Sequence, residues 1–191
     1  LIILCIVISF VSIEPCTAKT TNLIENGEFE TISNAKGIID RWIPAEGSVV
    51  SKAGGQKGYV SVSKDGYSGN CLKIATMSGN KPWVVQKVSV VEGAVYEIST
   101  YLKVKKLTNG SAVFKIEFYD GIKHLGSDQT LKLSSEVHDW AKISKTVKAF
   151  KGANLMYLYL RNLGNVESYW DNVSCVMTVS PPVVVAGTDN V

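Results

Sequence analysis

The sequence has few histidines and none of the residue arrangements that usually carry catalysis. Only two of its 191 residues are histidine, and His124 and His138 stand in polar stretches predicted to be turns, without Cys/His metal-site spacing. There is no Ser-His-Asp order and no nucleophile elbow. Glycosidases need two carboxylates at a set separation, and Glu117 and Asp120 would diverge at a strand end. These absences predict a domain without enzyme activity.

The chain also lacks a strong charge of either sign and a helical pattern. The formal net charge at pH 7 is +3, and the basic residues are spread out except for Lys103, Lys105 and Lys106. This charge is too small to indicate nucleic-acid binding. No stretch keeps apolar residues at a 3.6-residue period, which excludes long amphipathic helices. An apolar content of 46% with 19% charged residues is typical of one globular domain.

Long apolar runs are absent except at the start, where residues 1–13 are almost wholly apolar. The run is too short to span a membrane, and small residues follow it up to Ala18. We therefore expect residues 1–18 to be a secretory signal, clipped at its start, with a longer hydrophobic anchor as the alternative. Residues 19–179 would form the folded domain of a secreted or cell-surface protein. Two prolines after Ser180 predict that residues 180–191 are a linker or the start of a further domain.

Cysteine is scarce as well. Two of the four cysteines lie in the expected signal, which leaves Cys71 and Cys175. Export favours oxidation of thiols, so we expect one Cys71–Cys175 disulfide that closes a loop of about 100 residues. The alternative is two buried free thiols that pack as small apolar side chains.

What the sequence does have is a regular alternation of apolar and polar residues. Three segments, residues 96–104, 112–119 and 155–161, place apolar side chains at every second position, so each has an apolar and a polar face. Asn109-Gly110 predicts a tight turn between the first two. Shorter strands are predicted at residues 39–42, 59–63, 71–75, 83–91, 140–150 and 169–179. Eight or more such strands predict an all-β fold, an antiparallel β-sandwich of two sheets.

The polar faces of the three alternating segments share one feature, which is tyrosine rings among charged side chains. These residues are Tyr101, Tyr119, Tyr157, Tyr159, Glu117 and Arg161. A row of flat rings beside hydrogen-bonding groups can bind a sugar or a protein. The alternative is that tyrosine favours strands and that these rings only cover the sheet.

Several motifs follow one another in a fixed order along the chain. The first is Asn-Leu followed by Asn-Gly-Glu-Phe-Glu at residues 26–30, and the last is Tyr-Trp-Asp-Asn-Val at residues 169–173. Between them stand Trp42, the segment 69–74, Gln86, the turn 93–96 and the segment 140–142. In this order the chain resembles carbohydrate-binding modules of the family 4, 9 and 22 type over residues 21–178. Cys71 departs from the pattern, because the family has a small residue there.

The resemblance implies a jelly-roll sandwich with a ligand cleft on one concave sheet. Trp83 and Gln86 join the candidates for that cleft, and Gln86 matches a polar contact of the family. They lie on opposite faces of one regular strand, so both line the cleft only if a bulge intervenes. The predicted function is non-catalytic binding of a polysaccharide or oligosaccharide, which targets covalently linked domains, such as an enzyme, to glycan. The alternative is a structural or adhesive β-sandwich of a cell-surface protein.

The resemblance also implies a structural calcium ion where the first and last strands meet. Glu30 and Asp171 are the expected ligands, and Asp65 and the carbonyls of the Gly-rich loop 64–70 are further candidates, since calcium takes hard oxygen ligands. The alternative is two exposed carboxylates at strand ends. Trp42, Trp140 and Trp170 are expected to be structural, because large aromatic side chains dominate protein cores.

Overall fold

The computed structural model describes residues 21–33, 38–44, 58–76 and 81–181, and the expected signal and the end of the expected linker lie outside these ranges. Within them all regular structure is β-strand, all strand pairs are antiparallel, and no helix could span a membrane. The strands are β1 (Ile32–Ser33), β2 (Ile38–Ile39), β3 (Ile43–Pro44), β4 (Gly58–Ser63), β5 (Cys71–Thr76), β6 (Trp83–Ser89), β7 (Val95–Asp120), β8 (Lys123–Leu133), β9 (Val137–Lys148) and β10 (Leu155–Val179).

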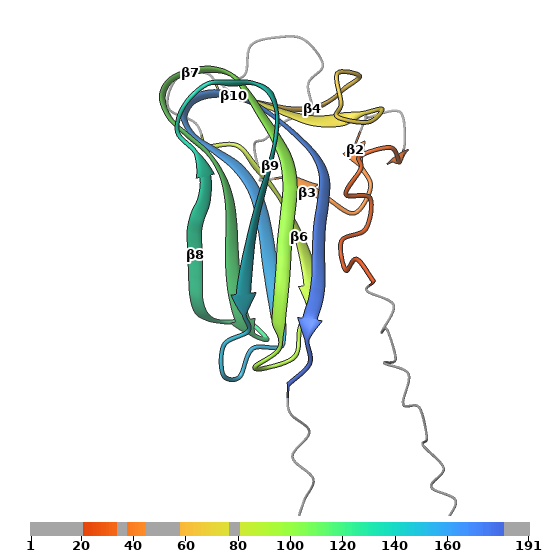
Figure 1. Ribbon diagram of the computed structural model, residues 1–191, viewed down its shortest axis with the longest axis vertical. Helices are drawn as coiled ribbons and strands as arrows, with labels where there is room; N and C mark the ends of the chain where they lie inside the picture. The colour runs from red at the N-terminus through yellow and green to blue at the C-terminus, as the bar shows by residue number, and fades with distance from the viewer. Residues whose placement is uncertain (1–20, 34–37, 45–57, 77–80, 182–191) are drawn as a thin grey trace, which may run out of the picture.

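Two long strands, β7 and β10, organise the fold. They pair over nearly their whole lengths, and both arch over one end of the molecule (Figure 1). The first layer contains β9, the start of β7, the end of β10, β5 and β4. The second layer contains β8, the end of β7, the start of β10, β6 and β3. One continuous sheet is thus doubled over, and the prediction of an all-β, antiparallel sandwich is confirmed.

The predicted tight turn at Asn109-Gly110 is wrong, because the segments on either side of it belong to one strand, β7. Gly110 pairs with Gly164 of β10, and both have positive φ angles, +115° and +76°. A Cβ atom on Gly110 would lie 1.8 Å from the carbonyl oxygen of Leu163. A Cβ atom on Gly164 would lie 2.2 Å from the carbonyl oxygen of Asn109. The two glycines therefore let both strands bend together from one layer into the other.

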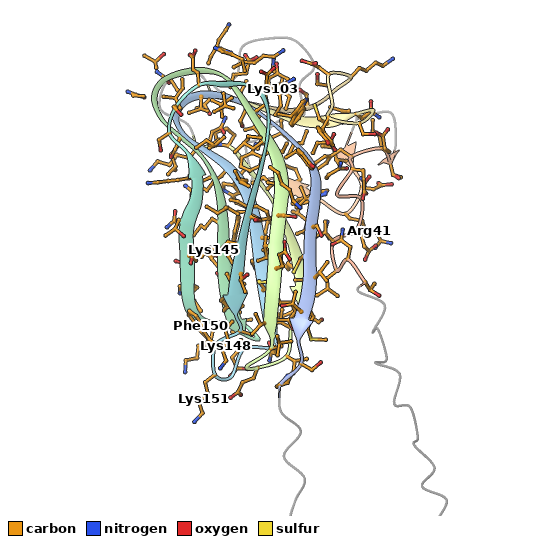
Figure 2. All side chains as sticks on the ribbon, viewed as in Figure 1. Arg41, Lys103, Lys145, Lys148, Phe150 and Lys151 are labelled. Atoms are coloured by element: carbon orange, nitrogen blue, oxygen red, sulfur yellow. The ribbon has the colours of Figure 1, made fainter. Side chains whose placement is uncertain are left out.

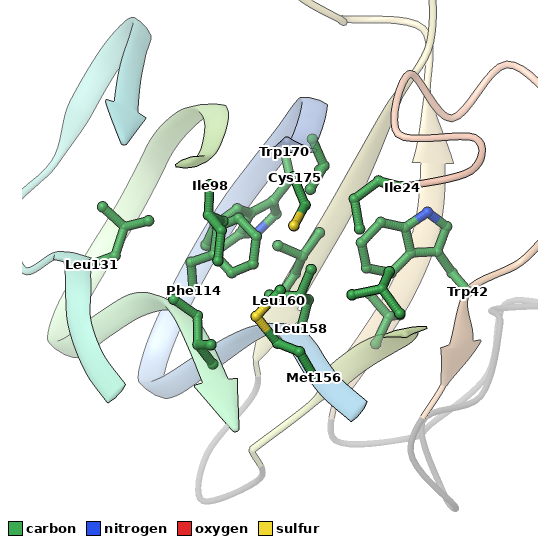
Figure 3. Packing of buried hydrophobic residues seen from close by; sticks show 14 of the residues in the cluster. Ile24, Trp42, Ile98, Phe114, Leu131, Met156, Leu158, Leu160, Trp170 and Cys175 are labelled. Atoms are coloured by element: carbon green, nitrogen blue, oxygen red, sulfur yellow. The ribbon is translucent and has the colours of Figure 1, made fainter. Parts of the chain in front are cut away.

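The core lies between the two layers (Figure 3). Trp170 of the first layer meets Phe114 of the second with ring centroids 6.4 Å apart, and both side chains are fully buried. Trp42 is also buried, and its indole N–H donates to the carbonyl of Asn26 at 3.1 Å. These two tryptophans are structural, as predicted. Trp140 differs, because it is half-buried on the outer face of the first layer, at the edge of the Tyr67 ring, and is not part of the core.

A buried polar network holds β10 in place just beside its bend. The side-chain amide of Asn162, fully buried, donates to the carbonyls of Ile74 and Val166, each at 2.9 Å. Its oxygen accepts from Ser168, whose hydroxyl in turn accepts from the indole N–H of Trp170 at 2.8 Å. Because a buried polar group without a partner is costly, this complete set of bonds favours one position of the bend.

The strand β8, which the sequence pattern did not predict, is an edge strand of the second layer. Most of its side chains are exposed, so it lacks the apolar alternation that marks the other strands. An ion pair of 2.5 Å joins Asp128 of β8 to Lys145 of β9 (Figure 2). The two histidines are exposed as predicted, but His124 lies in β8 and His138 in β9, and not in turns.

The predicted disulfide is wrong, because Cys71 and Cys175 are free and buried. Leu72 pairs with Trp170, so Cys71 lies beside Asp171, four residues along β10 from Cys175. Four residues of strand span about 13 Å, whereas bonded cysteines need Cα atoms within about 7 Å. Cys175 also belongs to the core, whereas Cys71 does not. Burial raises the pKa of both thiols to about 12, which leaves them protonated and unreactive at neutral pH.

The paired glycines generate a prediction about stability. We expect Gly164→Ala to lower the free energy of unfolding, measured by urea denaturation, because the new methyl group meets the carbonyl of Asn109. Gly152→Ala is the matched control, since Gly152 also has a positive φ of +79° but a Cβ atom there would have no other atom within 4 Å. The loss should be roughly 1–3 kcal/mol larger for Gly164→Ala than for Gly152→Ala. Equal losses would show that the close approach is unimportant.

Candidate functional site

The outer face of the second layer carries most of the predicted site residues. Residues directly opposite each other in an antiparallel pair share a face. In β10, Arg161 is opposite Trp83 of β6, Tyr159 is opposite Lys115 of β7, Tyr157 is opposite Glu117, and Leu155 is opposite Tyr119. We call this surface the aromatic face, and its residues are Trp83, Lys87, Lys115, Glu117, Tyr119, Tyr157, Tyr159 and Arg161. Three strands in register are therefore needed to build it.

Four aromatic rings form a row along this face. The Trp83 and Tyr159 centroids are 5.3 Å apart in an edge-to-face arrangement, and Tyr159 and Tyr157 are 6.3 Å apart. Tyr157 and Tyr119 stack at 4.4 Å. The Lys87 ammonium lies 4.6 Å from the centre of the Tyr157 ring. All four rings are half-buried, so each one is fixed by its neighbours and still exposes part of its surface. Such a row can stack against the apolar faces of sugar rings.

Glu117 lies near the middle of the row and is already paired within the protein. Its carboxylate forms an ion pair with Lys115 and accepts a hydrogen bond of 2.9 Å from the hydroxyl of Tyr119. Burial acts to raise the pKa of Glu117, but the hydrogen bonds from Lys115 and Tyr119 outweigh it and lower the pKa below its usual value. Burial and the nearby carboxylate raise the pKa of Tyr159 in turn. Glu117 is therefore ionised, and its oxygens hold the row of rings in position.

Arg161 has a different environment from that of Glu117. Its Nε atom is buried without a hydrogen-bond partner, and the guanidinium forms no ion pair with any residue in the described ranges. Burial lowers the pKa of Arg161, and the negative charge of Glu117 partly offsets this effect. Arginine stays charged in proteins under all ordinary conditions. Arg161 is thus a half-buried cation without a carboxylate of its own.

The structure does not bring Gln86 and Tyr101 to the aromatic face. Gln86 lies on the opposite side of β6 from Trp83, and its buried amide exchanges hydrogen bonds of 2.8 and 2.9 Å with the backbone of Glu25. Gln86 also lines a pocket of about 410 Å³ at the uncovered edge of β6, where Glu25 pairs with Arg41 (Figure 2). Tyr101 belongs to the first layer and stacks on Tyr67 at 3.7 Å.

Sequence reasoning missed two residues of the aromatic face, Lys87 and Lys115. Lys87 is opposite Tyr157, and Lys115 lies 5.5 Å from the centre of the Tyr159 ring. The alternating pattern placed Lys115 on the same side as Tyr119, which was the available signal. Lys87 could not be placed in the same way, because its neighbour across the sheet is set by pairing between strands far apart in sequence.

The expected calcium ligands lie at the other layer. Glu30 accepts hydrogen bonds from the backbone and side-chain amides of Asn70 at 2.7 and 2.8 Å. Asp171 is fully buried and accepts from the backbone N–H groups of Ser68 and Asn172 at 3.0 and 2.7 Å. Burial raises the pKa of Asp171, and the negative charge of Glu30 adds to the effect.

The oxygen atoms of Glu30 and Asp171 suit a hard cation, and neither carboxylate pairs with a cationic side chain among the described residues. Asp65 does not join them, because it pairs with Lys103 and Lys105 at 3.2 and 2.6 Å. Accordingly, no three Asp, Glu, His or Cys side chains gather as a metal site in the part of the chain that the structure describes. Any cation there would need backbone carbonyls in addition to the two carboxylates.

Comparison with known proteins identifies the architecture. No family model and no curated protein matches the sequence. The structure is similar to the C-terminal family 22 carbohydrate-binding module of Clostridium thermocellum Xyn10B, with a TM-score of 0.55, 14% identity, and coverage of 83% of this chain and 99% of that one. This chain shares the β-sandwich fold of that module.

Two further structures share this fold. The CBM22-1 xylan-binding domain of Paenibacillus barcinonensis Xyn10C has a TM-score of 0.52 and 19% identity, with coverage of 73% of this chain and 87% of that one. The enzymatically active domain of bacteriophage CBA120 tailspike protein 4 has a TM-score of 0.61 and 14% identity over 82% of this chain. The matched region is only 21% of the tailspike chain, so this protein spans about a fifth of it.

The pairing of Glu117 predicts a pH dependence of stability. The pKa of Glu117 is lowered in the folded state, so its contribution is present above the unfolded value of about 4.3 and is lost as the pH falls through the folded pKa. We expect wild-type protein to lose more stability than Glu117→Gln between about pH 6 and about pH 3. Urea denaturation at both pH values measures this difference, and parallel losses in the two proteins would contradict it.

Proposed function

We propose that this protein is a non-catalytic, extracellular carbohydrate-binding module that binds a polysaccharide chain along the aromatic face. The row of four half-buried rings from β6, β7 and β10 is the observation that carries the proposal. The rings supply apolar stacking surface, and the charged groups between them supply hydrogen bonds to hydroxyls. Such a module raises the local concentration of a linked domain at the glycan surface. Xylan is the first glycan to test, because similar structures are described as xylan-binding.

Affinity electrophoresis in gels that contain soluble xylan, β-glucan or mannan tests this function. We expect retardation by at least one glycan, and its loss in Tyr157→Ala or Tyr159→Ala, since truncation of a central aromatic contact costs at least about 2 kcal/mol, or about 30-fold in affinity. Tyr101→Ala is the matched control, because it removes a tyrosine from the opposite layer and should leave retardation unchanged. Full retardation of the Tyr157 and Tyr159 variants would contradict the proposed face, and no retardation of wild type would favour an adhesive or structural domain.

We also propose that a calcium ion stabilises the protein between Glu30 and Asp171. Support comes from the buried carboxylate of Asp171, which has no cationic partner among the described residues, from the neighbouring Glu30, and from the loop between β4 and β5 that both carboxylates hold. When bound, the ion would neutralise the two negative charges and join that loop to β10. Its role would be structural, since it lies on the layer opposite the aromatic face.

Thermal unfolding with and without calcium tests this proposal. Calcium at about 100 times its Kd would add about 2.7 kcal/mol to the stability of the folded state. We expect a chelator to lower the Tm of wild-type protein and to leave the Tm of Asp171→Asn unchanged. Asp65→Asn is the control that should keep the calcium response, because Asp65 is paired with lysines. A wild-type Tm that calcium does not change would refute the proposal.

A further inference from the structure

The charges on the aromatic face are unbalanced in favour of cations. Opposite Arg161 in β10 lies Val113 of β7, and opposite Val113 lies Lys132 of β8, so both cations are on this face. Lys87 and Lys115 lie further along the same face. Among the described residues that lie opposite one another on this face, from Trp83 at one end to Tyr119 at the other, Glu117 is the one carboxylate. A neutral polysaccharide does not require this excess of positive charge.

The pairing within the face leaves two of its cations without an ion pair in the described residues, Lys132, which is exposed, and Arg161, which is half-buried. Lys115 is bonded to Glu117, and Lys87 lies over the ring of Tyr157. Both oxygens of Glu117 are engaged, one by Lys115 and the other by Tyr119. The Arg161 side chain is only half-buried, its guanidinium has no ion-pair partner among the described residues, and it lies directly opposite Trp83, at one end of the row of rings. A half-buried guanidinium in this position is suited to a carboxylate, which it can bind through two parallel hydrogen bonds.

We infer that the glycan bound by this face carries uronic acid residues, and that Arg161 binds a uronate carboxylate beside the ring of Trp83. This inference rests on the proposed function, and it names the chemical class of the ligand. Trp83 and Tyr159 would stack against sugar rings while the guanidinium binds the charged substituent. The other cations of the face would add a weaker and salt-dependent attraction, because exposed charges are screened by salt.

The test compares one polysaccharide in two chemical forms. Glucuronate-substituted xylan is used as prepared and after reduction of its carboxyl groups to alcohols, which keeps the backbone and removes the charge. We expect wild-type protein to bind the acidic form roughly tenfold or more tightly than the reduced form in titration calorimetry, as for a charge-assisted hydrogen-bonded pair. In a high-salt buffer that screens the other cations, Arg161→Gln should bind the two forms equally, and Arg161→Lys should keep only part of the preference, since lysine lacks the planar fork.

Two controls separate the outcomes. Lys142→Gln removes an exposed cation from the opposite layer, where Lys142 pairs with Tyr101, and should leave the preference unchanged. Unfolding midpoints of all variants show whether each one is folded, and Arg161→Lys provides a conservative substitution if Arg161→Gln is unstable.

Equal binding of both xylans by wild type would overturn the inference and leave the proposed function intact. A preference that survives in Arg161→Gln at high salt, or is lost in Lys142→Gln, would overturn the role of Arg161. Failure to bind either xylan or any neutral glycan would reject the proposed function itself.

Discussion

Every other strand of the eight-stranded sheet depends on the pairing of β7 with β10, whereas β1 and β2 pair only with each other. β8 and β9 attach only to β7, and β5 and β6 attach to β10, so the two long strands carry both layers. Their shared bend requires the backbones to pass within a distance that no Cβ atom allows, which Gly110 and Gly164 make possible. The network around Asn162 then satisfies the polar groups that the bend buries.

The same bend decides which aromatic residues act together. Tyr101 and Tyr119 occupy one strand and the same side of the alternating pattern, yet they face opposite sides of the molecule, because β7 changes layer between them. Trp83, in contrast, joins Tyr159 through strand register, although 76 positions separate them in the chain. The aromatic face is thus a product of three strands in register.

Two places in the structure hold a fully or partly buried charged side chain, Asp171 and Arg161, that has no ion-pair partner among the described residues. At the layer that contains Tyr101, the carboxylates of Asp171 and Glu30 lie close together without a cationic partner in the described residues. On the aromatic face, Arg161 is a cation without a carboxylate of its own. On the same face, Lys115 and Glu117 form an ion pair with each other. An uncompensated charge is costly to bury, and this cost is the physical basis of the two ligands proposed above.

Local alternation was enough to predict most strands of the sandwich, the core sides of β7 and β10 and the tyrosine-bearing faces, because the side-chain period of two belongs to each strand alone. The strand predicted at residues 39–42 is wrong, because residues 40–42 connect β2 to β3 and only Ile39 lies in a strand. It missed β8, an edge strand whose exposed side chains need no alternation. Asn109-Gly110 is a dipeptide typical of tight turns, but Gly110 pairs with Gly164 of β10, so β7 bends at this point and does not end. Strand register determines three features that the sequence alone did not show. These are the separation of Cys71 from Cys175, the position of Gln86, and the absence of a carboxylate partner for Arg161 among the described residues. Register arises from contacts between residues far apart in the chain, so only the tertiary structure decided them.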